Sequence, residues 1–191
     1  MIKYAITGNI ASGKSSVEKV LISMGYKVLD TDLVAHKLLQ ESSAEIIKRF
    51  NGYDITEGHN KNVISRSKLG EIVFSDIKLK KELENIIHPK VKKEINTFFE
   101  NNKNEDKVFV SIPQLFESKS EKMFDKIILI FTSDNIRLER LKKRNNYSEE
   151  YAVKRINSQI PQEDKIQKSD IVIYNNSSIQ DLEQAVIKTF G

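Results

Sequence analysis

The stretch Gly8-Asn9-Ile10-Ala11-Ser12-Gly13-Lys14-Ser15 matches the pattern Gly-x4-Gly-Lys-Ser/Thr, in which backbone N–H groups of a glycine-bearing loop cradle phosphate groups. Residues 2–7 before it are typical of a short buried strand, and residues 13–24 after it carry apolar side chains at helical spacing. The alternative is a chance glycine turn before a helix, which these flanking elements disfavour. The stretch therefore predicts binding of a nucleoside triphosphate.

The fixed residues of the motif have physical roles. Gly8 and Gly13 let the backbone approach an anion and adopt positive φ angles at little steric cost, and the next helix presents unpaired N–H groups to the phosphates. Lys14 is expected to reach the β and γ phosphates, and the Ser15 hydroxyl to ligate Mg2+. The residues expected here to bind the nucleotide are Gly8, Ala11, Ser12, Gly13, Lys14, Ser15 and Ser16.

Composition restricts the class of protein. A chain of 191 residues with 39% hydrophobic and 30% charged residues predicts one domain with inserted subregions. No apolar run is long enough to span a membrane and no apolar leader precedes the first strand, so we expect a cytoplasmic protein with no membrane partner. The absence of cysteine excludes disulfides and thiolate metal sites. A net charge of +4 spread along the chain suits an anionic ligand and does not indicate nucleic acid binding.

Strand and helix patterns alternate along the chain. The expected strands are residues 3–7, 26–30, 107–112, 126–131 and 170–174. Short Val/Ile-rich strands separated by helices predict a five-stranded parallel sheet between two helical layers, an α/β/α fold. The core is expected at about 1–40, 105–135 and 168–191, with a helical insertion at about 41–104 and a helical lid at about 136–167.

Some helix ends are also predicted. Ser65 and Asp76 are expected N-caps, and Pro89 marks a boundary after a helix over 77–88 or the first turn of the next helix. Two charged helices, 135–144 and 148–159, surround a turn at 145–147, and a final helix begins near Ser178 with Asp181 in a capping-box arrangement.

Two carboxylates follow the second strand. Asp30 and Asp32 are expected at the carboxyl edge of the sheet, where ligands of such folds bind. One can orient Mg2+ while the other accepts the proton of an attacking hydroxyl. The alternative is that either of them caps the next helix.

Arginines dominate the expected lid. Arg137, Arg140 and Arg144 follow the spacing i, i+3 and i+7, which predicts one helical face. With Arg155 on the next helix they could close on a transferring phosphoryl group. The alternative is an ordinary solvated helix.

Two other segments are ambiguous by themselves. His88 before Pro89 suits a helix end or a core position as well as a ligand contact, and the apolar side chains of residues 112–117 suit a substrate contact as well as the core.

With these motifs assembled, the chain resembles dephospho-coenzyme A kinases nearly from end to end. Residues 7–16 are similar to the family's opening Thr-Gly-Gly-Ile-Gly-Ser-Gly-Lys-Ser/Thr, and residues 30–32 to its Asp-Ala-Asp segment. Other similar segments are Arg66 to Phe74, Leu83 to Pro89, Ile112 to Glu117, Arg140 to Gln159, and Ser169 to Asn175.

The resemblance implies ATP-dependent, Mg2+-dependent phosphorylation of the ribose 3'-hydroxyl of dephospho-coenzyme A, the last step of coenzyme A synthesis. It makes Asp32 the candidate general base, and Lys14, Arg140 and Arg144 the groups that stabilise the γ-phosphoryl. It implies that the helical insertion receives the coenzyme. The remaining expected contacts are Asp32, Arg66, His88, Pro113, Leu115 and Arg155 for the substrate, Asn175 for the nucleotide, and Asp30 beside Ser15 for the metal. A monomer is expected.

Four positions depart from the family pattern. Asn9 and Ala11 replace glycines, which leaves fewer loop residues free to take a positive φ. Gln114 replaces a leucine beside the expected coenzyme site, and His36 stands where an arginine is common.

Two other functions share parts of this sequence pattern. A different small-molecule or nucleoside monophosphate kinase shares the loop, lid and base. A GTP-dependent switch is disfavoured because no Asp-x-x-Gly occurs, and Asn102-Lys103-Asn104-Glu105 ends in Glu where guanine recognition expects Asp.

Overall fold

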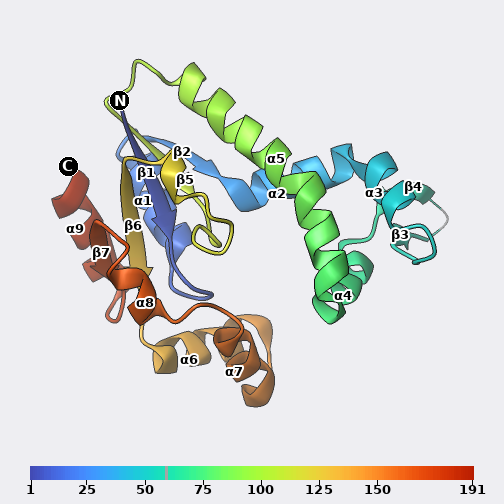
Figure 1. Ribbon diagram of the computed structural model, residues 1–191. Helices are drawn as coiled ribbons and strands as arrows, with labels where there is room; N and C mark the ends of the chain where they lie inside the picture. Colours follow the sequence, from blue (N-terminus) through green and yellow to red (C-terminus); the bar gives the residue numbers. More distant parts are fainter. Residues whose placement is uncertain (59) are drawn as a thin grey trace. The chain divides into compact units, whose positions relative to one another are not determined.

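The computed structural model describes residues 1–58 and 60–191 (Figure 1). The chain forms two compact units, one made of Met1–Asp30 and Phe99–Gly191 and the other of Thr31–Phe98. The first contains a five-stranded sheet in the order β2-β5-β1-β6-β7, in which all neighbouring strands are parallel. The strands are β1 (Ile2–Thr7), β2 (Lys27–Asp30), β5 (Lys107–Ser111), β6 (Lys126–Phe131) and β7 (Ile171–Tyr174). The predicted fold class and its five parallel strands are confirmed.

The core of the first unit lies between the sheet and two helices, α1 (Lys14–Ser23) and α9 (Ile179–Phe190). Leu21 of α1 and Phe190 of α9 are buried in one apolar cluster with Phe109 of β5. Each such side chain contributes about 1.5–3 kcal/mol when it leaves water. The capping box predicted for α9 is present, because the Ser178 hydroxyl accepts from the Asp181 N–H and the Asp181 carboxylate accepts from the Ser178 N–H.

The second unit has its own apolar core, which includes Ile46, Phe50, Ile64 and Leu69. Its helices are α2 (Thr31–Glu41), α3 (Ser43–Arg49), α4 (Arg66–Ser75) and α5 (Ile77–Asn101), the last of which continues into the first unit. The insertion was expected to be helical, but it also contains two strands, because β3 (Thr56–Glu57) and β4 (Asn60–Ile64) pair as an antiparallel hairpin. β3 has two residues, too few to show a two-residue period.

Helix α5 corrects a second expectation, since it runs through Pro89 without a break. A proline removes one backbone hydrogen bond inside a helix. Buried side chains hold α5 on both sides of that defect, Ile87 before it and Ile95 after it. Asp76 caps α5 as predicted, because its Oδ1 accepts from the Lys78 N–H at 2.7 Å. Ser65 precedes α4 as predicted, but its hydroxyl contacts Ser67 Oγ and caps no backbone N–H.

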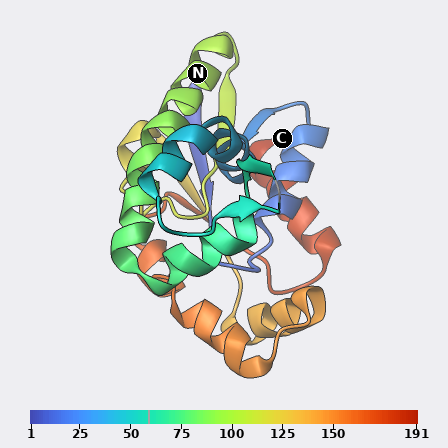
Figure 2. The ribbon, with the colours of Figure 1, turned by 90° about the vertical axis from the view of Figure 1, so that its right-hand side faces the viewer.

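The predicted pair of charged helices is present in the first unit as α6 (Asp134–Asn145) and α7 (Glu149–Asn157). Asn146 between them has a φ of 52°, a left-handed conformation that Asn tolerates better than most residues. Both views of the ribbon place these helices at the end of the sheet toward which β1 and β6 run (Figure 2). A short helix, α8 (Gln162–Ile166), leads back to β7. In the described part of the chain, no helix combines the length and apolarity needed to span a membrane.

Candidate active site

The loop between β1 and α1 is shaped around two glycines. Gly8 passes so close to β6 that an added Cβ would lie 2.6 Å from the Ile130 carbonyl oxygen. Gly13 precedes α1 with a φ of 98°, in the left-handed region. Ala11, which replaces a family glycine, also adopts a positive φ, 62°, whereas Asn9 does not. The chain therefore uses a left-handed alanine where it lacks a glycine.

The three polar residues after Gly13 begin α1. Lys14 lies in the first turn, and its Nζ donates to the Gly8 carbonyl at 2.7 Å, across the mouth of the loop. The side chain of Ser15 is exposed and that of Ser16 is half-buried. The helix end, the ammonium and the hydroxyls are thus gathered at one position, where a helix N-terminus favours an anion.

Asn175, directly after β7, is fixed against this loop. Its side chain is 5% exposed and its Nδ2 donates to the Ser12 carbonyl at 2.7 Å. The Thr132 hydroxyl also contacts the Ser12 carbonyl, at 2.9 Å. The two contacts bring the ends of β6 and β7 to the phosphate loop.

Arg140 of α6 reaches the same place. Its guanidinium donates to the Ala11 carbonyl at 3.3 Å and to the Asn175 carbonyl at 3.2 Å. Burial lowers the pKa of this guanidinium from its ordinary value, but an arginine keeps its charge. Among the described residues it forms no ion pair. A partly buried cation beside the loop with no carboxylate partner is suited to a bound anion.

The expectation that Arg137, Arg140 and Arg144 act from one helical face is wrong for Arg137. Its side chain is only 2% exposed, and its Nη2 donates to Asp134 Oδ1 at 2.6 Å. Arg144 is exposed, and its Nε donates to Asn145 Oδ1 at 2.9 Å. Arg155 is half-buried in α7.

The carboxyl edge of the sheet carries the first of the two carboxylates. Asp30 ends β2 and pairs in register with Ser111 at the end of β5. The Ser111 hydroxyl donates to Glu18 Oε1 of α1 at 2.6 Å. Asp32 lies exposed in the first turn of α2.

The second unit brings Arg66 and His36 together. Arg66 Nη2 and His36 Nε2 are 2.6 Å apart, and both side chains are exposed. A guanidinium only donates, so the imidazole nitrogen is the acceptor in this contact. His88 is half-buried inside α5.

The segment after β5 divides between core and surface. Leu115 is fully buried, with 0% exposure, so its side chain belongs to the core in this structure. Pro113 is half-buried and its carbonyl accepts from the Thr7 hydroxyl at 3.4 Å. Gln114, the departure from the family pattern, is exposed.

With this geometry established, comparison with known proteins decides the family. A family model described as dephospho-CoA kinase matches residues 2–181. The chain belongs to the dephospho-CoA kinase family. The sequence resemblance is thereby confirmed, and with it the expectation of a phosphotransferase with ATP as co-substrate.

Relatives in the family match over nearly their whole length. A dephospho-CoA kinase of Helicobacter pylori is 39% identical over 185 residues, which span 95% of this chain and 92% of the relative. A solved dephospho-CoA kinase from Campylobacter jejuni is 36% identical with a TM-score of 0.76, covering 98% of this chain and 94% of that one.

Two further structures share the fold. TT1252 from Thermus thermophilus is 32% identical with a TM-score of 0.84, over 100% of this chain and 98% of that one. A shikimate kinase from Acinetobacter baumannii, determined with shikimate, has a TM-score of 0.53 and 14% identity, over 99% and 92% of the two chains. The latter comparison supports the fold alone.

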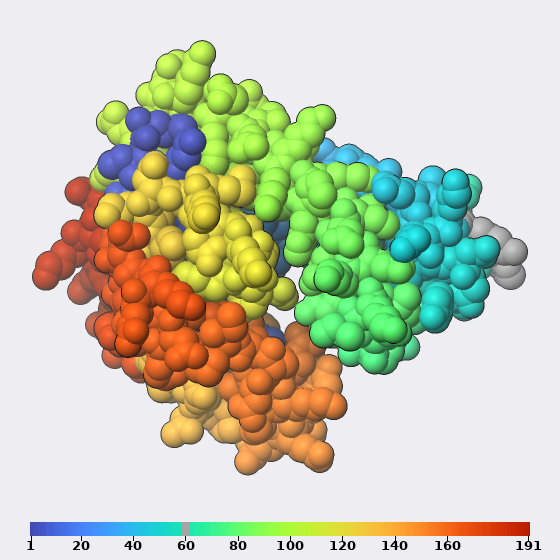
Figure 3. Space-filling model, viewed as in Figure 1, coloured from blue at the N-terminus to red at the C-terminus, as the bar shows by residue number. Residues whose placement is uncertain are grey.

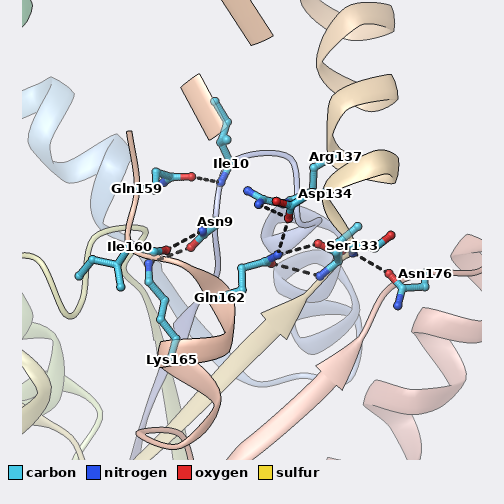
Figure 4. A network of polar contacts seen from close by, with 11 residues as sticks. Asn9, Ile10, Ser133, Asp134, Arg137, Gln159, Ile160, Gln162, Lys165 and Asn176 are labelled. Atoms are coloured by element: carbon cyan, nitrogen blue, oxygen red, sulfur yellow. Dashed lines mark hydrogen bonds and ion pairs between the residues drawn. The ribbon is translucent and has the colours of Figure 1, made fainter. Parts of the chain in front are cut away.

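Helix α8 contains two buried polar residues that no sequence motif indicated (Figure 4). Lys165 is fully buried, although its neighbours Glu163 and Asp164 are typical of a solvated turn. Gln162 is buried as well, and its Nε2 donates to the Thr132 carbonyl at 2.8 Å. No hydrophobic period marks either residue in the sequence, because both are buried by contacts with distant segments.

Proposed function

We propose that this chain transfers the γ-phosphoryl group of ATP to the ribose 3'-hydroxyl of dephospho-coenzyme A, giving coenzyme A and ADP, the last step of coenzyme A synthesis. Membership of the family supports the acceptor. The observation that best supports nucleotide binding is that Arg140 and Asn175 both donate hydrogen bonds to the loop between Gly8 and Gly13. We expect the reaction to take place in the cytoplasm and the enzyme to act as a monomer.

The loop residues bind and orient the triphosphate. Backbone N–H groups of residues 8–16 surround the phosphates, and the Lys14 ammonium leaves the Gly8 carbonyl to contact the β and γ oxygens. Arg140 adds a second fixed cation at the base of the lid, with Arg144 and Arg155 contributing when the lid closes. Such pre-positioned charges stabilise a phosphoryl group in transfer without reorganising at the moment of reaction.

The donors near the loop suit Mg2+. Magnesium takes oxygen ligands, retains several waters, and is bound through one or two protein groups together with substrate phosphates. The Ser15 hydroxyl and the Asp30 carboxylate are such groups, and the described residues contain no cluster of three or more His, Cys, Asp or Glu side chains that would form a dedicated metal cage. When bound there, the metal would neutralise charge on the β and γ phosphates.

Asp32 accepts the proton of the 3'-hydroxyl in this proposal. It is exposed in the first turn of α2. A carboxylate that takes a hydroxyl proton as the phosphoryl group moves is the usual base of kinases.

The remaining contacts are proposed for the coenzyme. The exposed Arg66, with His36 as its neighbour, offers a guanidinium to an anionic group of dephospho-coenzyme A. His88, Pro113 and Leu115 complete the proposed acceptor contacts, with Leu115 contributing as buried support. The helical insertion is the proposed acceptor-binding region.

To test this proposal, the purified protein is incubated with ATP, Mg2+ and one acceptor at a time, and the release of ADP is measured. Dephospho-coenzyme A should support rapid turnover, whereas a nucleoside monophosphate and shikimate should give the rate of ATP alone. A faster rate with either of the latter acceptors would contradict the proposed substrate. Chelation of Mg2+ should abolish turnover, and undiminished turnover in excess chelator would contradict the proposed metal.

A further inference from the structure

The ammonium of Lys165 is enclosed beside the phosphate loop (Figure 4). Lys165 in α8 is 0% exposed, and its Nζ donates to Asn9 Oδ1 at 2.8 Å and to Glu117 Oε1 at 2.9 Å. In the space-filling view the residues around Lys165, in orange, adjoin the yellow segment that contains Glu117 (Figure 3). A buried ion pair contributes little net stability, because desolvation offsets the attraction between its charges. Stability therefore does not account for this lysine.

Asn9, the loop residue that contacts Lys165, is held through both the oxygen and the nitrogen of its side-chain amide. Asn9 is buried, its Oδ1 accepts from Lys165, and its Nδ2 donates to the Ile160 carbonyl at 2.9 Å. The next loop residue is held as well, since the Ile10 N–H donates to Gln159 Oε1 at 2.7 Å. Residues 159–165, which follow helix α7, thus restrain Asn9 and Ile10 of the phosphate loop through hydrogen bonds.

The loop needs such a restraint. Ala11 has a φ of 62°, and the left-handed conformation costs a non-glycine residue about 1–2 kcal/mol. A strained residue persists only where its surroundings determine its conformation. Ile10 and Ala11 also pack against the apolar cluster of the lid helices, which contains Leu141 and Ile156.

We propose that Lys165 is a positioning residue for nucleotide binding: through the side chain of Asn9 it holds the backbone of residues 8–11 in the conformation that receives the triphosphate. This inference rests on the proposed function of the loop in binding ATP. In this proposal Lys165 acts through Asn9 and not by contact with the substrate. Glu117 balances its charge, and so joins the segment after β5 to the loop.

The design of variants takes account of Glu117, which is half-buried. Its Oε2 is buried with no hydrogen bond to any described residue, so removal of Lys165 alone leaves this carboxylate without its ion-pair partner and destabilises the protein. The double variant Lys165→Met with Glu117→Gln removes both charges at nearly constant volume. Asn9→Ala removes the loop contact and leaves the ion pair intact.

The experiment measures the Kd of a non-hydrolysable ATP analogue by calorimetry, together with KM for ATP and for dephospho-coenzyme A. Asn9→Ala and the double variant should each raise the Kd of the analogue about tenfold, as expected when a hydrogen bond to a charged group is lost. The triple variant, which combines Asn9→Ala with Lys165→Met and Glu117→Gln, should show no greater loss of affinity for the analogue than Asn9→Ala or the double variant. The reason is that both sets of changes break the same connection between Lys165 and the loop. The KM for dephospho-coenzyme A should stay unchanged.

Lys126→Met is the matched control. It breaks the Lys126–Asp170 ion pair at the other end of β6 and should leave the Kd of the analogue unchanged. Additive losses in the triple variant would overturn the proposal. A lower kcat with every Kd and KM unchanged would show a purely structural role, and would overturn it too.

The binding measurement separates this inference from the proposed reaction. If the wild-type protein binds the analogue but does not phosphorylate dephospho-coenzyme A, the proposed acceptor is wrong while the changes in Kd still decide the role of Lys165. If the wild-type protein binds no ATP analogue, both proposals are wrong.

Discussion

The guanidinium of Arg140 donates to the backbone carbonyl of Ala11 at 3.3 Å, and so connects helix α6 to the phosphate loop. The same guanidinium contacts the carbonyl and the side-chain oxygen of Asn175, at 3.2 and 3.3 Å. Three acceptors, from the loop and from the residue after β7, thus fix the orientation of the planar guanidinium. Among the described residues, this guanidinium has no carboxylate partner. The fork geometry of arginine, as well as its charge, is therefore required at this position.

Arg140→Lys should lower kcat by roughly tenfold to a hundredfold, because an ammonium keeps the charge but cannot span these acceptors and a phosphoryl oxygen together. Steady-state kinetics with ATP and dephospho-coenzyme A would measure the loss. Lys143→Ala, at an exposed position of the same helix, is the control and should leave kcat unchanged. Equal kcat for Arg140→Lys and wild type would contradict the assigned role.

Gly13→Ala should abolish ATP binding. An added Cβ would lie 2.2 Å from Asn175 Nδ2, and would displace the amide that holds the Ser12 carbonyl. Gly25→Ala is a matched control, because Gly25 also has a positive φ, 90°, but an added Cβ meets nothing within 4 Å. Gly25→Ala should cost about 1–2 kcal/mol of unfolding free energy and leave ATP binding intact, as calorimetry and thermal unfolding would show. Retained ATP binding in Gly13→Ala would refute this account of the loop.

Ala11→Gly should stabilise the protein. Removing the left-handed strain at Ala11 raises the free energy of unfolding by about 1–2 kcal/mol. The greater entropy of glycine in the unfolded chain lowers that free energy by about 0.5–1 kcal/mol. The expected net gain raises Tm by about one to four degrees in a chain of this size. A lower Tm would show that packing of the Ala11 methyl group against helices α6 and α7 outweighs the strain.

Asp32→Asn should retain ATP affinity and lose turnover by about a hundredfold or more, since a positioned general base contributes on the order of 10²–10⁴. The amide keeps the size of the side chain but cannot accept a proton. Calorimetry with an ATP analogue and single-turnover kinetics separate the two effects. Near-normal turnover would exclude Asp32 as the base.

Local sequence patterns predicted the sheet because the buried strands are short apolar runs bounded by motifs. For example, the strand predicted at residues 126–131 begins and ends in the structure at the same residues, Lys126 and Phe131. The capping residues Asp76 and Ser178 were predictable for a similar reason, since a cap acts on N–H groups two or three residues away.

Features that depend on distant contacts were not predictable in this way. Arg137 is almost fully buried and pairs with Asp134, although its helical spacing predicted a guanidinium that acts beside Arg140 and Arg144. Lys165 looks solvated from its neighbours, yet its partners Asn9 and Glu117 lie 156 and 48 residues away. The helix through Pro89 likewise depends on tertiary burial on both sides of the proline, which overrides a local preference.

The proposed reaction is tested most directly by 31P NMR of the purified enzyme with ATP, Mg2+ and dephospho-coenzyme A. The account predicts that ADP and a new phosphomonoester on the ribose 3'-oxygen form in equal amounts, giving coenzyme A. Formation of ADP without that phosphomonoester, or transfer to a different oxygen, would contradict it.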